Sequence, residues 1–171
     1  MLMSEDVLPN NLNIKTSDLE ALHDDAWRWA YSLVSDRYTA DDVMQRVYVE
    51  IVAGSARYDA QSSLKTWLFG VVRNIAYGHF RAEKRNVRLL TRLKTLATND
   101  RATITEPTTE VGSALSDLPA RQREVLELAI YREFTLEECA KIMGIGIGAV
   151  RTHYHRGKTT LRARLEDVNE S

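Results

Sequence analysis

A helix-turn-helix pattern between Thr135 and Leu165 constrains the fold of this chain more than any other stretch. Thr135 and Glu138 have the spacing of a capping box, in which the two side chains satisfy backbone N–H groups at the start of a helix. Gly144 follows where the chain must turn sharply, because a residue without Cβ adopts a positive φ at little cost. The stretch is therefore expected to form a short helix, a tight turn and a longer second helix.

The second helix of this pair is predicted to be apolar on one side and cationic on another. Residues suited to a core face recur every three or four positions, at Val150, Tyr154, Gly157, Leu161 and Leu165. Residues 148–165 contain five Arg or Lys and no Asp or Glu. Such a helix fits the major groove of duplex DNA, and the alternative is a helical hairpin with a solvated basic face. We favour DNA binding, because the charge is one-sided.

The net charge of the chain hides an uneven distribution. The 171 residues carry a formal net charge of −1 at pH 7. Residues 73–94 hold seven basic residues and one acidic residue, a net +6, and residues 148–165 hold a net +5, which leaves −12 for the rest. Two basic segments in an otherwise acidic chain indicate two local contacts with a polyanion.

Enzymatic functions have little support in the sequence. The chain contains no Gly-rich phosphate loop and no triad-like arrangement, and His153 and His155 point to different faces of a helix, which is a poor metal geometry. We therefore expect no cofactor, no metal ion and no catalysis. The lone cysteine, Cys139, has no internal disulfide partner and is expected to be a buried, reduced thiol.

The composition and the N-terminus indicate a cytoplasmic protein. A hydrophobic content of 44% with 27% charged residues is typical of a globular chain. The N-terminus lacks the basic and apolar segments of a secretory signal, and no apolar run approaches the length of a membrane span.

Helical periodicity begins after a polar N-terminal stretch. Residues 1–16 are predicted to be a flexible arm, and a first helix is expected from Ser17. A second helix is predicted over residues 39–53, with Thr39 as its N-cap and Asp42 in a capping position.

The strongest helical pattern of the first half runs from Leu64 to about Arg85. Its apolar stripe, which includes Trp67, is expected to be core. On the other side, Gly70 and Gly78 flank Asn74, and basic residues follow. Small residues around an Asn on a basic face would let a nucleic-acid strand approach closely. The alternative is a solvated basic end favoured by the helix dipole, and charge alone leaves both interpretations open.

The periodicity disappears over residues 95–113, which contain Pro107 and Gly112 and are predicted to be a flexible linker. A second domain is expected over residues 114–171, with Pro119 at the first position of its first helix. No strand alternation of useful length occurs in the sequence, so we predict an all-α fold with two small helical domains.

Four motifs in a fixed order carry a resemblance to a known family. They are TADDVMQRVYVEIV, SSLKTWLFGVVRNIAYGHFRAEKR, LSDLPARQREVLEL and TLEECAKIMGIGIGAVRTHYHRGKTTLRARL. Together they resemble the extracytoplasmic-function group of the bacterial sigma-70 family of RNA polymerase sigma factors, over about residues 18–90 and 114–166. No single motif is decisive, but four in order at the right separations make a specific signal.

The resemblance implies a sigma-2-like domain at residues 17–94 and a sigma-4-like helix-turn-helix domain at residues 114–171. It implies a non-catalytic subunit that binds core RNA polymerase, recognises promoter −10 and −35 elements and promotes DNA melting for transcription initiation. An anti-sigma factor, in many relatives anchored in a membrane, is implied as a further partner, and a small-molecule substrate is not. The implied place of action is the nucleoid in a bacterial cytoplasm.

The resemblance also implies roles for individual residues. Three match the surface that docks on the clamp helices of the polymerase: Asp41, Asp42 and Gln45. Three match the pocket for a base flipped from the −10 non-template strand: Tyr58, Val71 and Asn74. Four cations would hold the backbone of that strand: Arg73, Arg81, Lys84 and Arg85. Four residues match the positions that meet the −35 element in the major groove: Arg151, Thr152, His155 and Arg156.

Two other functions remain as alternatives. One is a free-standing helix-turn-helix regulator that binds an operator as a dimer, with residues 18–90 as an effector or dimerisation domain. The other is a protein-binding module that acts as a decoy for a sigma antagonist. An operator binder has no reason to carry the Asp41–Gln45 surface followed by Tyr58 and Asn74, and positive charge on two separate helices argues against a decoy.

Overall fold

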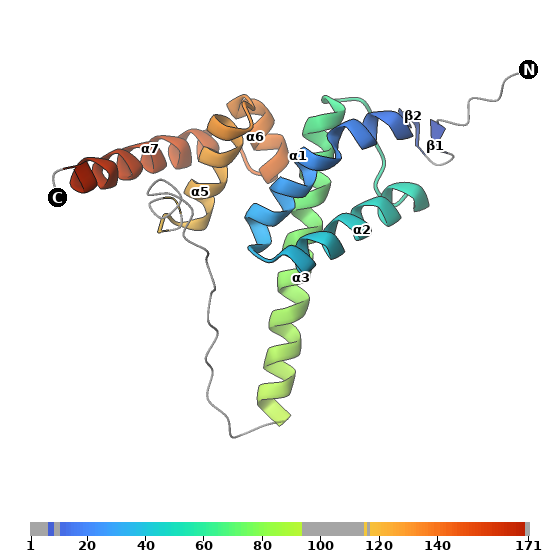
Figure 1. Ribbon diagram of the computed structural model, residues 1–171, viewed down its shortest axis with the longest axis horizontal. Helices are drawn as coiled ribbons and strands as arrows, with labels where there is room; N and C mark the ends of the chain where they lie inside the picture. Colours follow the sequence, from blue (N-terminus) through green and yellow to red (C-terminus); the bar gives the residue numbers. More distant parts are fainter. Residues whose placement is uncertain (1–6, 9–10, 94–114, 116, 170–171) are drawn as a thin grey trace, which may run out of the picture. The chain divides into compact units, whose positions relative to one another are not determined.

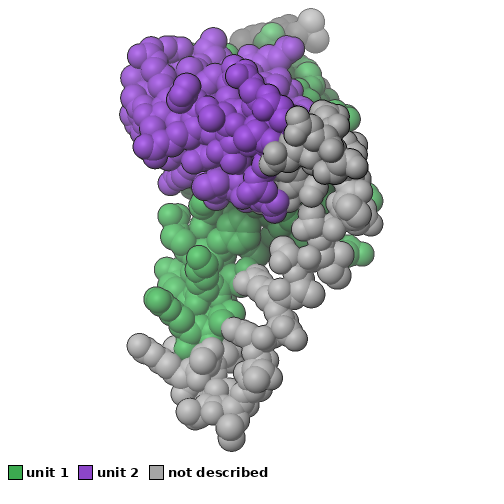
Figure 2. Space-filling model, turned by 90° about the vertical axis from the view of Figure 1, so that its left-hand side faces the viewer, with its two compact units in different colours: residues 1–102 green, residues 103–171 purple. Residues whose placement is uncertain are grey.

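Helices make up nearly all of the described chain (Figure 1). The computed structural model describes residues 7–8, 11–93, 115 and 117–169. The chain divides into two compact units, residues 1–102 and 103–171, which Figure 2 shows in different colours. The prediction of an all-α fold with two helical domains is confirmed. The linker predicted over residues 95–113 lies outside the described residues.

The first unit is built from α1 (Thr16–Val34), α2 (Arg37–Ala53) and α3 (Leu64–Leu93), each of which packs on the other two. All three helices contribute fully buried side chains, among them Ala26, Trp29, Ala30, Val47, Ile51, Leu68, Phe69 and Val72. Trp29 stacks on Phe69 with 6.0 Å between ring centroids, and its indole N–H donates to the Phe69 carbonyl at 3.1 Å. Full burial of a large apolar side chain stabilises a fold by about 1.5–3 kcal/mol.

The start of α2 differs from the prediction that Thr39 is its N-cap, and that prediction is wrong. The helix begins at Arg37, and Asp36 is the N-cap. The Asp36 carboxylate accepts hydrogen bonds from the Thr39 hydroxyl at 2.6 Å and from the Thr39 N–H at 2.7 Å, and these bonds lower the pKa of Asp36. Two residues with capping chemistry stand three positions apart, and the helix uses the first. Asp42 therefore takes no part in capping.

The N-terminal residues differ from the flexible arm expected over residues 1–16. β1 (Val7–Leu8) and β2 (Asn11–Lys15) form a short antiparallel pair. Ile14 is fully buried, and Asn11 is 5% exposed with its amide bonded to the backbone at the end of α2. This segment is held because one apolar side chain joins the core and one polar side chain completes a buried hydrogen-bond network.

α3 continues past the packed part of the first unit. Its end was expected at about Arg85, but the helix reaches Leu93. Figure 1 shows its C-terminal half extending beyond α1 and α2. Ala76 is the last buried residue of the described part of α3, and residues 84–88 are exposed. The basic residues of this half therefore lie on a helix that is open to solvent. Among the described helices, none combines the length and the apolar character of a membrane span.

The second unit contains α5 (Ala120–Leu126), η1 (Glu127–Tyr131), α6 (Leu136–Met143) and α7 (Ile147–Asn169). Pro119 was predicted to be the first residue of this helix. It is instead the N-cap of α5, and Ala120 is the first helical residue. η1 is a π-helix that continues α5, and the apolar period did not predict it, because a single π turn shifts the period only locally.

The predicted helix-turn-helix is confirmed in α6 and α7. Thr135 and Glu138 form the capping box: the Thr135 hydroxyl accepts from the Glu138 N–H at 3.2 Å, and the Glu138 carboxylate accepts from the Thr135 N–H at 2.9 Å. Gly144 ends α6 with a φ of 63°, the left-handed conformation that favours glycine. The two helices pack on each other, and their buried residues are Cys139, Ile142 and Met143 on α6 and Val150 and Gly157 on α7, within the described part of the chain.

Gly157 brings α7 close to α5. A Cβ at this position would lie 3.0 Å from Leu126 Cδ1 and 3.3 Å from Gln122 Cβ. The two helices therefore approach to a distance that only glycine allows without displacement of Leu126, which fixes the direction in which α7 leaves the domain core.

Candidate nucleic-acid interfaces

The first candidate interface is the α7 face, which we define as Arg151, Thr152, His155 and Arg156. All four residues are exposed and lie within the first turns of α7, which begins at Ile147. In a helix-turn-helix, the N-terminal residues of the second helix are the ones that reach base edges. Only two residues separate Gly144 from Ile147, the first residue of α7. The turn and the packing of α7 on α6 therefore fix where these side chains point.

Partners inside the protein leave most of the α7 face available. Arg151 Nη2 lies 3.4 Å from Glu137 Oε1, and both side chains are more than half exposed, so this ion pair is weak and exchangeable. The Thr152 hydroxyl donates to the Gly148 carbonyl at 2.9 Å. His155 and Arg156 have no side-chain partner among the described residues.

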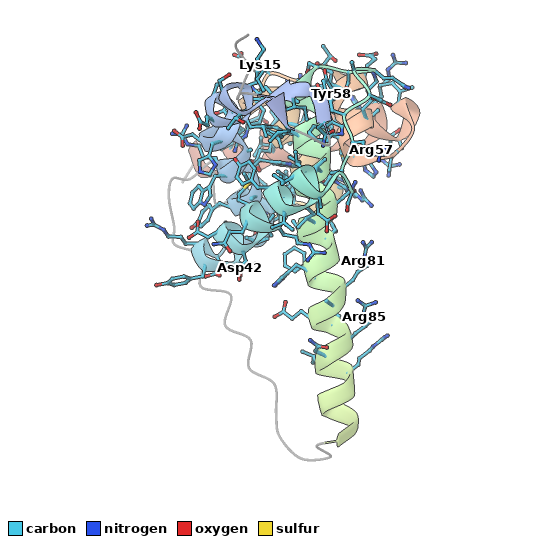
Figure 3. The ribbon with its side chains drawn as sticks, turned by 90° about the vertical axis from the view of Figure 1, so that its right-hand side faces the viewer. Lys15, Asp42, Arg57, Tyr58, Arg81 and Arg85 are labelled. Carbon is cyan, nitrogen blue, oxygen red and sulfur yellow. The ribbon has the colours of Figure 1, made fainter. Side chains whose placement is uncertain are left out.

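The second candidate interface is the α3 face, a stripe of residues three or four positions apart along one side of α3. Its members are Trp67, Val71, Asn74, Gly78, Arg81 and Arg85. Asn74, Arg81 and Arg85 are exposed, Val71 is half-buried, and the neighbouring Lys84 is also exposed. Figure 3 shows Arg81 and Arg85 projecting from the same side of α3, with Tyr58 and Arg57 beside its first turns. The arrangement offers one amide and several cations along a single helix side.

Arg73 stands apart from the other cations assigned to the −10 strand. It is 6% exposed, and its guanidinium lies 4.5 Å from the ring centroid of Tyr77. Position 73 is adjacent to the buried stripe of Leu68, Phe69, Val72 and Ala76, which turns its side chain away from the α3 face. A contact between Arg73 and a DNA backbone would require the side chain to leave this site.

Tyr58 belongs to the α2–α3 loop, residues 54–63, which we call the Tyr58 loop. Its ring packs on Trp67 with 5.4 Å between centroids, and its hydroxyl donates to the Ser62 carbonyl at 2.7 Å. Trp67 in turn donates its indole N–H to the Arg57 carbonyl at 3.0 Å. Trp67 was predicted to be a core residue, but it is half-buried and joins the loop to the start of the α3 face.

Asn74 lines a groove between α2 and α3 of about 530 Å³, which we call the α2–α3 groove. The other side chains around it are Asp42, Val43, Arg46, Glu50, Ile75, His79 and Ala82, with Gly78. Among the described residues, this lining includes neither Tyr58 nor Val71. The resemblance implies one base pocket for Tyr58, Val71 and Asn74. The structure places Tyr58 in the loop before α3 and Val71 and Asn74 on α3, with Asn74 lining the α2–α3 groove.

The three acidic and amide residues at the start of α2 also divide between two surfaces. Asp41 and Gln45 line a groove of about 610 Å³ between α1 and α2, and the Trp27 indole N–H donates to Asp41 Oδ1 at 2.6 Å. Asp42 lines the α2–α3 groove instead, and its side chain has no hydrogen-bond or ion-pair partner among the described residues. All three side chains are exposed. The predicted docking surface is therefore the edge of α2, reached from both sides.

Two residues of the first unit were not singled out in the sequence. Arg57 is exposed next to Tyr58 and adds a cation to the loop end of the α3 face. Asn11 bonds to the Tyr58 loop from β2. A lone Arg in a loop has no periodic context, and the partners of Asn11 lie 40 to 47 residues away, so no local pattern could reveal either one.

Cys139 is confirmed as a buried thiol. Its side chain, on α6, is fully buried. This burial, and to a smaller extent the nearby Glu138 carboxylate, raises the pKa of the thiol to about 12. A thiol with such a pKa is neutral and unreactive at physiological pH.

Two family models match the chain in the order of its two units. The model for Sigma-70 region 2 matches residues 19–86, and the model for Sigma-70, region 4 matches residues 108–161. The ECF RNA polymerase sigma factor EcfG of Rhodopseudomonas palustris is 30% identical over 139 residues, which cover 80% of this chain and 77% of the relative. The chain belongs to the extracytoplasmic-function (ECF) group of sigma factors.

Other relatives of this sigma factor agree. The ECF RNA polymerase sigma factor SigX of Bacillus subtilis is 27% identical over 161 residues, which cover 88% of this chain and 83% of SigX. The sigma factor RpoE, crystallised with the anti-sigma factor NepR from Bartonella quintana, is 26% identical with a TM-score of 0.70 over 88% of this chain and 95% of that one. CnrH, solved with the cytosolic domain of CnrY, shares the fold at 20% identity and a TM-score of 0.61, over 88% and 86%.

The two matched regions contain the candidate interfaces of this sigma factor. The Tyr58 loop and the α3 face lie within residues 19–86, and the α7 face lies within residues 108–161. Asn11 and the β1–β2 pair precede the match to region 2.

Proposed function

We propose that this sigma factor directs core RNA polymerase to promoters, reads their −10 and −35 elements and promotes melting of the −10 duplex. The observation that carries the proposal is the α3 face. It places an exposed Asn74 between the packed Tyr58–Trp67 ring pair and exposed cations, in the unit that does not contain the helix-turn-helix. A protein that only bound duplex DNA through α7 would gain nothing from this second surface.

The α7 face is the proposed reader of the −35 element. Arg151 and Arg156 can each donate two parallel hydrogen bonds to a guanine edge, and Thr152 and His155 can meet a base or a phosphate. Their exposure at the N-terminal end of α7 supports this role. We assign it to a sigma-4-like domain over residues 114–171.

The α3 face and the Tyr58 loop are the proposed readers of the −10 strand. The Tyr58 ring offers a stacking surface for an unpaired base, and the Asn74 amide can bond with a base edge. Arg81, Lys84 and Arg85 would hold the strand backbone. Arg73 would contribute less to this contact, because its guanidinium already lies over the Tyr77 ring. We assign these roles to a sigma-2-like domain over residues 17–94.

The exposed edge of α2 is the proposed contact with the polymerase. Asp42 has no internal partner among the described residues and is not a helix cap, so its charge is available to a basic partner surface. Asp41 and Gln45 would contribute from the groove between α1 and α2.

We further propose that the protein has no catalysis of its own, acts on the nucleoid in the cytoplasm and is controlled by an anti-sigma factor. The complex of the relative RpoE with the anti-sigma factor NepR supports such a partner. The free-standing operator binder is less favoured, since its function would leave the α3 face and the α2 edge without a role.

Run-off transcription tests this proposal. Core RNA polymerase, the purified sigma factor and a library of promoter-length duplex fragments are combined, and the transcripts are sequenced. We expect initiation that requires both proteins and starts at fixed distances from shared −10 and −35 sequences. Sequence-specific binding of the sigma factor to duplex DNA without any initiation would instead favour the operator binder.

A further inference from the structure

Asn11 of β2 is a buried amide whose polar atoms bond to the last turn of α2 and to the loop that follows it. The residue is 5% exposed. Asn11 Nδ2 donates to the Ile51 carbonyl at 2.7 Å and to the Ala56 carbonyl at 3.0 Å, and Oδ1 accepts from the Tyr58 N–H at 3.0 Å. Both donors and the acceptor of the amide are therefore used.

Two of these bonds hold the loop immediately on both sides of Arg57, and the third holds the last turn of α2. Ala56 is held through its carbonyl and Tyr58 through its N–H, while the Arg57 carbonyl accepts from the Trp67 indole at 3.0 Å. The backbone from residue 56 to residue 58 is thus fixed from β2 on one side and from α3 on the other. The Tyr58 ring that packs on Trp67 is attached to this fixed backbone, and its hydroxyl bonds to the Ser62 carbonyl of the same loop.

A smaller side chain at position 11 would leave the loop without this support. Alanine provides neither donor nor acceptor, so the Ala56 carbonyl and the Tyr58 N–H would have to find water or move, while the Ile51 carbonyl keeps its bond from the Gly54 N–H. Because loops with solvent-exposed ends are the first parts of a fold to open, we expect the Tyr58 loop to respond before the helical core does.

We infer that Asn11 is a positioning residue for −10 recognition, which sets the place of the Tyr58 ring by clamping the loop that carries it. The inference rests on the proposed function for its consequence in DNA recognition, but its structural half stands on the hydrogen bonds alone. It also gives the β1–β2 pair, which precedes the region matched by the family model, a part in reading the promoter.

Amide hydrogen exchange tests the structural half. In Asn11→Ala, the Tyr58 N–H and its loop should exchange faster, whereas the amides of α1 and α2 should keep their protection. The matched control is Val47→Ala, which truncates a fully buried side chain of α2 and leaves all three Asn11 hydrogen bonds in place. It should lower the melting temperature through loss of core packing. Unchanged exchange at Tyr58 in Asn11→Ala, or equal acceleration in Val47→Ala, overturns the inference.

Sequence selection by the holoenzyme tests the functional half. The full-length chain is assembled with core polymerase and offered a pool of short single-stranded DNA oligonucleotides of random sequence, and the bound fraction is sequenced. The wild type should enrich one base at one position. Asn11→Ala should reduce that enrichment at least about fivefold, the lower end of what one specific base contact contributes. Val47→Ala should retain it at a temperature where both variants are folded.

The outcomes separate the two proposals. If the wild type enriches no base, or Tyr58→Ala enriches as well as the wild type, the role of the Tyr58 loop fails and the inferred consequence fails with it. If Tyr58→Ala loses the enrichment but Asn11→Ala keeps it, only the role of Asn11 is overturned. Asn11→Asp is the second variant if Asn11→Ala does not fold: it keeps the acceptor for Tyr58 but repels the Ile51 and Ala56 carbonyls, so reduced enrichment is expected, and full enrichment contradicts the inference.

Discussion

The ring of Tyr58 lies on the ring of Trp67, with 5.4 Å between the centroids and 51° between the planes. Tyr58 comes from a loop and Trp67 from the first turns of α3, so this contact joins loop and helix into one surface. The Tyr58 hydroxyl is also held by the Ser62 carbonyl. An aromatic ring fixed in this way before DNA arrives loses little conformational freedom on binding, which favours recognition of an unpaired base.

Replacing Asn74 by Ala should impair opening of duplex promoters. The amide is exposed on the α3 face, so its loss removes a bond to a base edge and nothing that holds the fold. Open-complex formation, followed by fluorescence of a base analogue in the −10 region, should slow, while core binding stays intact. Asn86→Ala, an exposed Asn farther along the same helix, is the control and should have no effect. A template melted in advance should restore activity to Asn74→Ala, and loss of core binding would contradict the assignment.

Replacing Arg156 by Ala should weaken recognition of the −35 element by about 1–3 kcal/mol, the range for one bidentate contact with a base. Arg162→Ala is the comparison, since Arg162 is an exposed cation six positions farther along α7. If Arg162 contacts a phosphate, its replacement should lower affinity for all sequences alike and reduce the salt dependence of binding. Competition binding of the holoenzyme to matched and scrambled −35 sequences distinguishes the two effects. Equal discrimination by Arg156→Ala and the wild type would refute the base contact.

Replacing Asp42 by Asn should weaken binding to core polymerase. Its charge has no partner within the described part of the chain, so the substitution removes an interaction with the polymerase and no internal bond. We expect a loss on the order of 1 kcal/mol, larger at low ionic strength, as for an exposed ion pair. Titration of labelled sigma factor with core polymerase measures it. Asp18→Asn, an exposed acid in the first turn of α1, is the control, and an equal loss in both variants would argue against a specific contact at Asp42.

Replacing Gly157 by Ala should destabilise the second unit. The added Cβ would lie 3.0 Å from Leu126 Cδ1, and overpacking of this kind costs about 1–3 kcal/mol, of which the higher helix propensity of alanine offsets up to about 1 kcal/mol. Gly148→Ala is a matched control in the same helix, because nothing lies within 4 Å of a Cβ there. Its higher helix propensity should raise stability by up to about 1 kcal/mol. Thermal unfolding should therefore rank Gly157→Ala below the wild type and Gly148→Ala above it, and the reverse order would mean that α5 and α7 pack differently.

The Cys139 thiol should resist modification in the folded protein. Burial raises its pKa to about 12, above the ordinary value of 9.0, so the reactive thiolate forms only as the pH rises toward that value. A colorimetric thiol reagent at pH 8 should label the native chain far more slowly than the chain in denaturant. Equal rates would contradict the burial of this thiol.

The sequence predicted the helices and the helix-turn-helix well, because both have local signals. Thr135 and Glu138 are three residues apart, and their capping box is a matter of that spacing alone. The N-cap of α2 was mispredicted for the opposite reason: Asp36 and Thr39 both have capping chemistry, and only the backbone conformation at residue 36 decides between them.

The details of the candidate interfaces could not be predicted, because they depend on contacts between distant segments. The separation of Asp42 from Asp41 follows from the packing of α2 between α1 and α3. The bonds of Asn11 reach across 40 to 47 residues, and the burial of Arg73 against Tyr77 depends on which side of α3 meets the core. In each case the residue type was visible in the sequence, but its neighbours were not.

Reactivity of promoter thymines toward permanganate tests the proposed function most directly, since only unpaired thymines react. A duplex promoter from the run-off library is incubated with core polymerase, with the sigma factor, or with both. We predict reactive thymines at the −10 element only when both proteins are present, and fewer of them with Asn74→Ala. Transcription-competent complexes that leave the −10 thymines unreactive, or melting that Asn74→Ala and Tyr58→Ala leave unchanged, would contradict the role assigned to the α3 face and its loop.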